Sequence, residues 1–121
     1  MDQSILVVED SLVIRDLITR ALRSALLPFV ETDDMYEALG ILNKQDIALI
    51  ITNLHIEEKT SLEFITRIRS FPKFNSIPAL YLSQPHDPNA SKDLLAAGFQ
   101  GYLKHPYTRE ELVEKVMEMI E

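Results

Sequence analysis

Short apolar runs alternate along the chain with longer stretches in which apolar residues recur every three or four positions. The short runs are typical of strands buried on both faces of a sheet, and the longer stretches are typical of amphipathic helices. Strands are predicted at 4–8, 29–32, 47–53, 79–83 and 101–104. Helices are predicted at 11–26, 33–42, 60–71, 87–98 and 108–120.

Five strands alternating with five helices predict an α/β fold in which helices cover both faces of a parallel sheet. Right-handed crossovers make this a doubly wound, three-layer sandwich. The length of 121 residues and the absence of cysteine fit a single domain, 1–121, whose core needs no disulfide.

The first predicted helix shows how faces are assigned. A serine precedes it as a cap, and its inward stripe is predicted to be Ile14, Leu17, Ile18, Ala21, Leu22 and Ala25. Its solvent side is predicted to be Arg15, Asp16, Arg20 and Arg23. In the last helix, Thr108 and Glu111 form a capping-box pattern, and Glu111 is spaced to pair with Lys115.

Polar side chains follow several of the predicted strands. In an open parallel sheet the carboxyl ends of the strands meet at one edge, where ligands bind. The topology therefore predicts that one edge of the sheet brings together Glu9, Asp10, Asn53, Ser83 and His105. Two adjacent acids after a central strand favour a site over a plain polar loop.

These residues give the chain a resemblance to the receiver domain, the module of bacterial response regulators in two-component phosphorelay signalling. The motifs are Val7-Val8-Glu9-Asp10, Ile50-Ile51-Thr52-Asn53, Tyr81-Leu82-Ser83 and Lys104-His105-Pro106-Tyr107. Each motif is weak by itself, but four in order on the expected elements indicate the fold strongly. The resemblance implies the CheY-like, flavodoxin-like strand order 2-1-3-4-5, and a cis bond between His105 and Pro106.

The resemblance also implies a role for each residue at the edge. In the family an aspartate after the third strand accepts a phosphoryl group from a histidine kinase, and two acids after the first strand help it to hold Mg²⁺. Glu9 and Asp10 match those acids, Ser83 matches the switch hydroxyl and Tyr102 the switch aromatic. The nearby lysine of the family neutralises the phosphoryl oxygens.

Two central positions depart from that pattern. Asn53 stands where the acceptor aspartate is expected, and His105 where the lysine is expected. The register is supported by Ser61-Leu62-Glu63, which stands where the family has a glycine followed by a Leu-Glu pair. Because the glycine is also lost and Glu57 replaces a usual proline, a natural pseudo-receiver is favoured over one engineered change at Asn53. A working receiver with another acceptor, or with an engineered Asn53, is kept as the alternative.

The losses have a joint physical consequence. With a neutral amide in place of a third carboxylate, the site carries less negative charge, so it has less need of both Mg²⁺ and the lysine. We therefore expect no resident metal or other cofactor, with Glu9 and Asp10 holding Mg²⁺ only weakly. His105, beside these two carboxylates, is expected to form a pH-sensitive pair with them.

Composition narrows the function further. A net charge of −7 argues against direct nucleic-acid binding, and no apolar run is long enough to span a bilayer. The acidic start shows no signal peptide, so a cytoplasmic protein is expected. We expect a non-enzymatic module that binds protein partners, with a homodimer left open. The expected surface is the fourth helix, fifth strand and fifth helix, with candidates Ser91, Lys92, Tyr102, Glu111, Lys115 and Met119.

A small flavodoxin-like or phosphohydrolase enzyme is the rival from another class. A flavin phosphate would need a Ser-, Thr- or Gly-rich turn after the first strand, but Glu9-Asp10-Ser11 stands there. A phosphohydrolase would need an aspartate nucleophile, and Asn53 removes the obvious one. The partner and pathway, and whether the chain stands alone or belongs to a larger regulator, are left open by the sequence.

Overall fold

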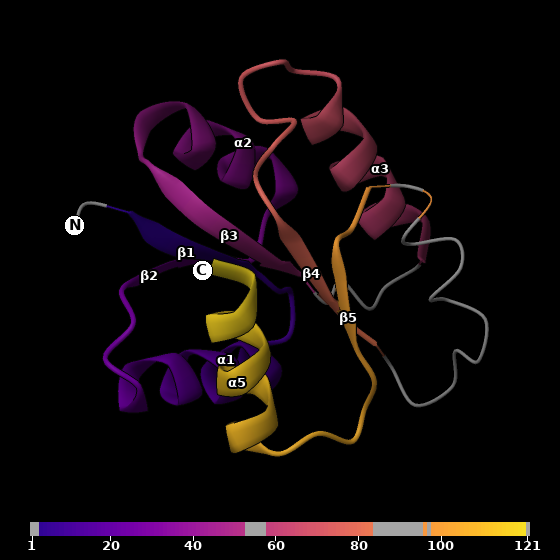
Figure 1. The fold of residues 1–121 in the computed structure, drawn as a ribbon. Coiled ribbons are helices and arrows are strands. Elements are labelled where there is room, and N and C mark those ends of the chain that lie inside the picture. The colour runs from indigo at the N-terminus through magenta and orange to yellow at the C-terminus, as the bar shows by residue number, and fades with distance from the viewer. Residues whose placement is uncertain (1–2, 53–57, 84–95, 97, 121) are drawn as a thin grey trace.

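The five predicted strands form one parallel sheet in the order β2-β1-β3-β4-β5 (Figure 1). The computed structural model describes residues 3–52, 58–83, 96 and 98–120. The strands are β1 (Ser4–Val8), β2 (Phe29–Thr32), β3 (Ile47–Thr52), β4 (Ala79–Leu82) and β5 (Gly101–Leu103). The helices are α1 (Leu12–Ser24), α2 (Met35–Lys44), α3 (Glu58–Arg69) and α5 (Arg109–Ile120). The predicted doubly wound sandwich is confirmed, while the helix predicted at 87–98 lies almost wholly outside the described residues.

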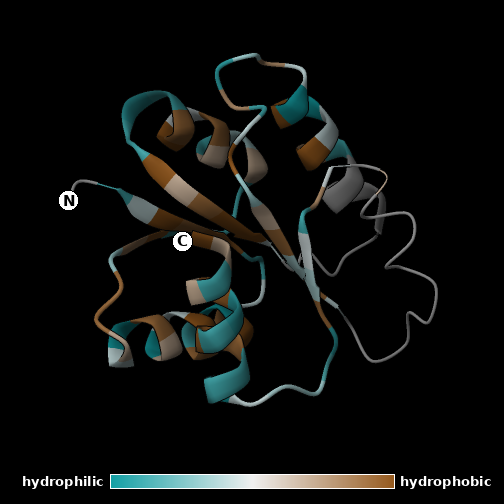
Figure 2. Cartoon of the chain, viewed as in Figure 1, coloured by the Kyte–Doolittle hydropathy of each residue, from teal (hydrophilic) through white to brown (hydrophobic). Residues whose placement is uncertain are grey.

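The sheet separates two apolar cores. Along β1, Ile5 and Val7 pack with α1 and α5, whereas Leu6 and Val8 pack with α2 and α3, because successive strand residues point to opposite faces. All four side chains are at most 2% exposed. The central strands are correspondingly hydrophobic along most of their length (Figure 2). A strand with both faces covered explains why the apolar runs in the sequence are continuous instead of alternating.

Side-chain caps fix the predicted starts of two helices. Ser11 Oγ accepts a hydrogen bond from the Ile14 backbone N–H at 3.3 Å, which caps α1. At α5, Thr108 and Glu111 satisfy each other's backbone N–H groups at 2.9 and 3.0 Å, as the capping box requires. Because Glu111 is engaged there, Lys115 pairs instead with Glu118 at 3.4 Å, which corrects the expected Glu111–Lys115 pair.

Helix α3 begins earlier than the sequence pattern indicated. The helix predicted at 60–71 is already formed at Glu58, the first described residue after the gap at 53–57. Glutamate and lysine are good helix formers and an acid is favoured in a first turn, so Glu58 and Lys59 suit the helix.

Two faces of α1 also differ from the expectation. Leu17, assigned to the inward stripe, is 61% exposed. The side chain of Arg15, assigned to the solvent side, is only 16% exposed and lies 3.1 Å from Glu31 of β2. The helix is thus rotated so that Ile18 lies at the centre of its buried side, and Leu17 falls outside it.

Arg69 ties the end of α3 to the segments that precede β4 and β5. Its guanidinium donates to the Gly98 carbonyl at 3.1 and 2.8 Å, to the Phe74 carbonyl at 3.0 Å and to Gln100 Oε1 at 2.9 Å. Gln100 Oε1 in turn accepts from the Ala79 N–H at the start of β4. Gly98 has a φ of +127°, a conformation that other residues rarely adopt.

Candidate functional site

The acidic pair emerges from the centre of the sheet. The last residue of β1, Val8, lies between Thr32 of β2 and Thr52 of β3, so the next two residues sit at the carboxyl edge between neighbouring strands. Glu9 is fully buried there, and its Oε2 accepts a hydrogen bond from the Ser11 N–H at 2.8 Å. Ser11 therefore both caps α1 and helps to hold the carboxyl group.

Burial changes the chemistry of Glu9. Loss of solvent, with a smaller contribution from the neighbouring Asp10, raises the pKa of its carboxyl group from 4.5 to about 8. The Ser11 N–H and the charge of Arg15 oppose this rise but do not cancel it. Glu9 is therefore mostly an uncharged carboxylic acid at pH 7.

Two further oxygens are buried at this edge of the sheet. They are Asp10 Oδ1 and Thr52 Oγ1. Thr52 is fully buried. It lies two residues after Ile50 on the strand, so both belong to the side of the sheet that α2 and α3 cover. The buried Asp10 oxygen is a potential ligand for a cation or a donor group.

Arg15 is a residue of this region that the sequence analysis missed. Its Nη1 donates to the Glu9 backbone carbonyl at 2.8 Å, while its Nε donates to Glu31 at 3.1 Å. It thereby joins α1 to the ends of β1 and β2. Periodicity placed it on the solvent side because the helix pattern carries no information about an acid on a neighbouring strand.

Ser83 and His105 connect the ends of β4 and β5. Ser83 is 1% exposed, and its N–H donates to the Leu103 carbonyl at 3.0 Å. Its Oγ accepts from the His105 N–H at 3.3 Å, and the bond from His105 to Pro106 is cis, as the resemblance implied. The Ser83 hydroxyl, predicted as the switch hydroxyl, therefore lies at the expected edge, where it accepts a hydrogen bond from the backbone of His105.

The imidazole of His105 does not take the place of a lysine beside the acids. His105 is exposed, and its ring lies edge-on to Tyr107, with centroids 6.1 Å apart. The ion pairs of the described residues are Arg15–Glu31, Asp16–Arg20 and Lys115–Glu118. The expected pairing of His105 with Glu9 and Asp10 is thus not formed within this part of the chain.

Tyr107 is an aromatic residue whose phenol is influenced by Glu9. Burial raises the pKa of its phenol to about 12, and the charge of Glu9 contributes to the rise. The sequence showed Tyr107 only as part of a motif, and its position two residues after a cis bond gave no signal of where its ring would lie. Tyr102, the expected switch aromatic, is half-buried and packs against the core on the α2 and α3 side.

The described part of β3 ends at Thr52, directly before the position predicted as the acceptor. Asn53 itself, together with Ser91 and Lys92, lies outside the described residues. Within the described ranges, no three His, Cys, Asp or Glu side chains are placed so that they could hold a metal ion. The structure thus brings together Glu9 and Asp10 at one point of the edge and Ser83 and His105 at another.

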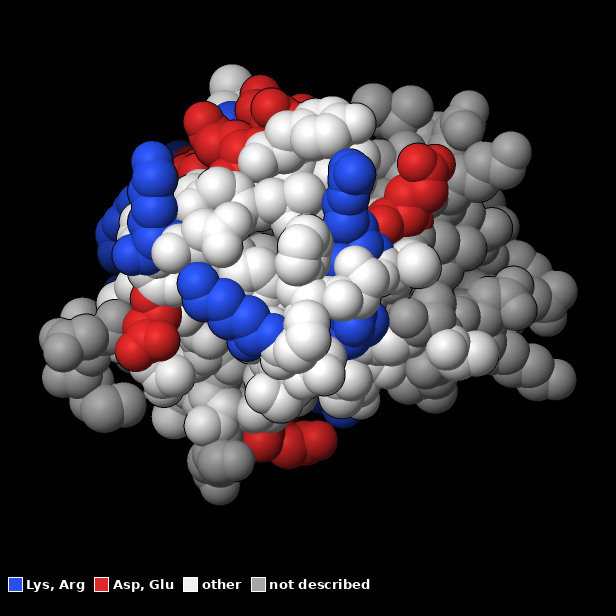
Figure 3. All heavy atoms as spheres, turned by 90° about the horizontal axis from the view of Figure 1, so that it is seen from above, with Lys and Arg blue, Asp and Glu red and all other residues white. Residues whose placement is uncertain are grey.

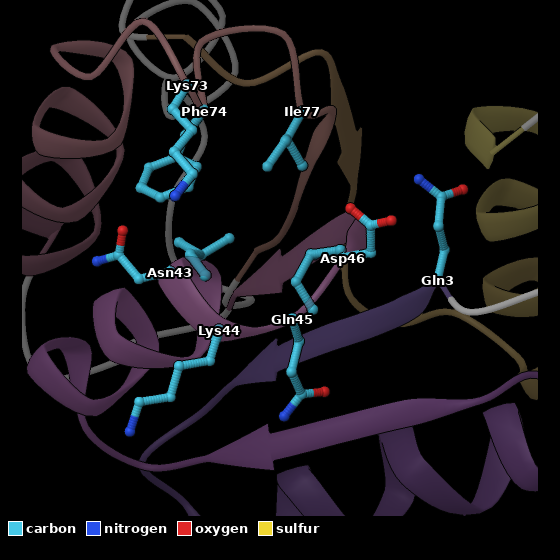
Figure 4. A pocket seen from close by; sticks show the side chains of 10 residues that line it. Gln3, Asn43, Lys44, Gln45, Asp46, Lys73, Phe74 and Ile77 are labelled. Carbon is cyan, nitrogen blue, oxygen red and sulfur yellow. The ribbon is translucent and has the colours of Figure 1, made fainter.

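A hollow of about 730 Å³ lies at the opposite edge of the sheet (Figure 4). It is bordered by Gln3 and Asp46, which precede β1 and β3, and by Lys73 and Phe74, which follow α3. Five residues of a strand span about 16 Å. The length of β1 therefore separates this hollow from the acidic pair, and it is not part of the candidate site.

A model of the response regulator receiver domain matches residues 5–117. The chain belongs to this family. As a receiver domain of a two-component response regulator, it carries the acidic pair and the hydroxyl at the edge where the resemblance placed them.

Individual receiver proteins show the extent of the similarity. The two-component response regulator ORR3 of Oryza sativa subsp. indica is 28% identical over 103 residues, which cover 84% of this chain and 79% of ORR3. The chemotaxis protein CheY homolog of Campylobacter jejuni is 27% identical over 118 residues, which cover 96% of this chain and 91% of that protein. The structure of CheY4 from Vibrio cholerae superposes with a TM-score of 0.85 at 25% identity, over 98% of this chain and 99% of CheY4.

The surface of the receiver carries mixed charge. On the face seen in Figure 3, the described lysines and arginines are separated by uncharged and acidic residues and form no continuous basic patch. Among the helices that the structure describes, none has the length and apolar character needed to cross a membrane.

Proposed function

We propose that this receiver domain takes up no phosphoryl group at the end of β3 and serves two-component signalling as a non-enzymatic protein-interaction module. The observation that carries the proposal is Asn53, the residue directly after β3. An amide is uncharged and a poor nucleophile, so the acceptor chemistry of the family has no obvious group at this position.

The surroundings of the site support the same function. A phosphoryl group would need a cation nearby to balance its charge. The residue at the lysine position is His105, whose ring is exposed and contacts Tyr107. Glu9, buried and mostly protonated at pH 7, gives the edge less negative charge than a pair of ionised acids would.

The same residues fit Mg²⁺ only in part. Asp10 Oδ1 is buried next to the Glu9 carboxyl group, so it is an oxygen that Mg²⁺ could take. Glu9 would have to lose a proton before acting as an anionic ligand. If Mg²⁺ binds, Glu9 and Asp10 would hold it, and it would supply positive charge to the edge. We therefore propose weak Mg²⁺ binding and no resident cofactor.

We further propose that partners dock on β5 and α5, in a cytoplasmic setting. Glu111 is exposed on this surface, and Tyr102, Lys115 and Met119 are half-buried, so each offers part of its side chain to a partner. The overall charge of −7 favours protein over nucleic acid as the partner.

The test is to incubate the protein with acetyl phosphate, and separately with beryllofluoride, each with Mg²⁺. We expect no phosphorylated intact mass and no NMR shifts centred on Glu9, Asp10 and Ser83. Phosphorylation mapped to another side chain would replace the proposal with a working receiver that uses a different acceptor.

An Asn53→Asp variant is the matched control. If this variant is still phosphorylated poorly, the site has lost more than its acceptor and the proposal stands. If one substitution restores ready phosphorylation, the rest of the site is intact, and an active receiver with a changed Asn53 becomes the better interpretation.

A further inference from the structure

The outer side of α1 carries exposed apolar residues that the fold does not use. Val13 is 71% exposed and Leu17 is 61% exposed. With Arg20 and Ser24 they are spaced by four, three and four residues, so they form one stripe along the helix. This stripe leads from Val13 toward the C-terminal end of α1.

A groove begins where that stripe ends. It has a volume of about 420 Å³ and lies between the end of α1 and the first half of α5, lined by Ser24, Ala25, Arg109, Glu110, Val113 and Glu114. Met117, one helical turn beyond Val113, is 42% exposed and continues the α5 side of the groove. The two helices lie on the same side of the sheet (Figure 1), so the stripe and the groove form a single surface, here called the α1–α5 face.

The charges of the α1–α5 face are divided between its two helices. The exposed charged residues on α1 are Arg20 and Arg23, with Asp16 bound to Arg20 at 2.9 Å. The α5 side of the groove carries Glu110 and Glu114 with Arg109. The end of α1 is therefore basic and the groove side of α5 is on balance acidic.

We propose that the α1–α5 face binds a second copy of this chain through a two-fold interface. A two-fold axis places the same surface of both copies together, so the α1 side of one copy meets the α5 side of the other. Basic and acidic halves then face each other twice, around the apolar stripe. A uniformly basic or uniformly acidic partner would be repelled by one half. The α1–α5 face does not include Asn53, so the dimer is tested separately from the proposed loss of phosphorylation.

The first test is sedimentation equilibrium of the whole chain over a wide concentration range at about 0.15 M salt, where charges more than about 8 Å apart are screened. We expect a reversible monomer–dimer equilibrium. Leu17→Glu should weaken dimerisation by about tenfold or more, because it places a charge in the apolar part of the interface.

Leu12→Glu is the matched control. Leu12 is 69% exposed on the same helix, but it lies about 140° around the helix from Leu17. We expect Leu12→Glu to leave dimerisation unchanged. Far-ultraviolet circular dichroism of both variants shows that they are folded.

A charge-exchange experiment tests the two-fold arrangement itself. Arg20→Glu makes both halves acidic, and Glu114→Lys makes the acidic half more basic, so each variant should dimerise more weakly than the natural chain. Mixing the two variants should restore association as a heterodimer, because each acidic half then meets a basic half. Arg23 is left in place because its guanidinium lies 5.3 Å from the Phe29 ring centroid.

Two results would overturn the proposal. One is a natural chain that stays monomeric at every concentration, which would leave the face to a different partner. The other is a dimer that Leu17→Glu does not weaken, or that mixing the charge variants does not restore, because either places the interface elsewhere.

Discussion

Glu9 makes the stability of the receiver depend on pH. The pKa of its carboxyl group rises from 4.5 to about 8 on folding, so between these values the folded chain holds a proton that the unfolded chain releases. The stabilising contribution is complete below pH 4.5 and is lost as pH rises through about 8. In metal-free buffer we expect the free energy of unfolding to fall by about 1 kcal/mol per pH unit across this window, measured by urea denaturation.

Glu9→Gln separates this effect from other titrations. The amide has nearly the same shape and cannot ionise, so the variant should lose most of the slope between pH 5 and 8, a range of about three pH units. It should also be more stable than the natural chain at pH 8, because its folding neither takes up a proton nor buries a charged carboxylate. An unchanged slope in Glu9→Gln would show that another group causes the pH dependence.

Leu26 carries backbone strain that a glycine would remove. It follows α1 with a φ of 59° and is 90% exposed. The N–H of Leu26 donates to the Arg23 carbonyl and that of Leu27 to the Leu22 carbonyl, both at 3.0 Å, which is the Schellman motif that usually ends in glycine. We expect Leu26→Gly to raise the free energy of unfolding by about 0.5–1 kcal/mol in urea denaturation.

Leu26→Ala provides the comparison. Alanine removes the exposed apolar side chain but keeps a Cβ atom, so the left-handed conformation stays strained. We expect this variant to gain clearly less stability than Leu26→Gly. Equal gains in both variants would attribute the effect to the lost side chain and not to the backbone.

The residues that sequence reasoning missed share one physical cause. Arg15 donates to Glu31 of β2, and the charge of Glu9 influences Tyr107, so both interactions join different elements of the fold. Hydrophobic periodicity reports only which side of an element is apolar. By contrast, Glu9 and Asp10 could be predicted because strand order alone brings them to the edge of the sheet.

At the scale of elements, Arg69 holds three segments with one side chain. Lysine keeps the charge, but its three N–H donors share one nitrogen, so it cannot reach Gly98, Phe74 and Gln100 from the separate positions that the guanidinium nitrogens occupy. We expect Arg69→Lys to lower the free energy of unfolding by about 1–2 kcal/mol in thermal or urea denaturation.

Arg67→Lys is the control on the same helix, because Arg67 is exposed and near the same end of α3. Its expected effect is within about 0.5 kcal/mol. Similar losses in both variants would mean that arginine in general, and not the bridge to Gly98, stabilises this end of the helix.

Element boundaries show where local patterns are sufficient. The caps at Ser11 and Thr108 were predictable because each depends on residues within one turn. The exposure of Leu17 could not be predicted, because the sequence does not show at which residue the apolar side of a helix ends. Only packing of α1 on the sheet and α5 decides which border residue is covered, and it covers Ile18 and Leu22.

At the scale of the whole molecule, topology accounts for both the success and the limits of prediction. The alternation of strands and helices, with right-handed crossovers, left few arrangements, and the receiver resemblance chose among them. The site depends on finer contacts. Strand order places His105 at the right edge, but it does not determine that its ring turns to Tyr107.

Carboxyl groups placed at the ends of both β1 and β3 are expected to influence one another. Asn53→Asp adds a carboxyl group directly after Thr52, the residue that pairs with Val8 before the acidic pair. Like charges held together oppose folding unless a cation offsets them. In EDTA at neutral pH we therefore expect this variant to unfold more readily than the natural chain, by about 1 kcal/mol or more in urea denaturation.

Mg²⁺ should reverse that loss only in the variant. If the added carboxylate creates a site with a Kd of about 1 mM, then about 10 mM Mg²⁺ would stabilise the variant by about 1.4 kcal/mol. The natural chain should change much less, because Asn53 adds no charge and Glu9 is mostly protonated. Equal stabilisation of both chains by Mg²⁺ would show that Glu9 and Asp10 bind the metal well by themselves, and the degenerate site proposed here would then have to be abandoned.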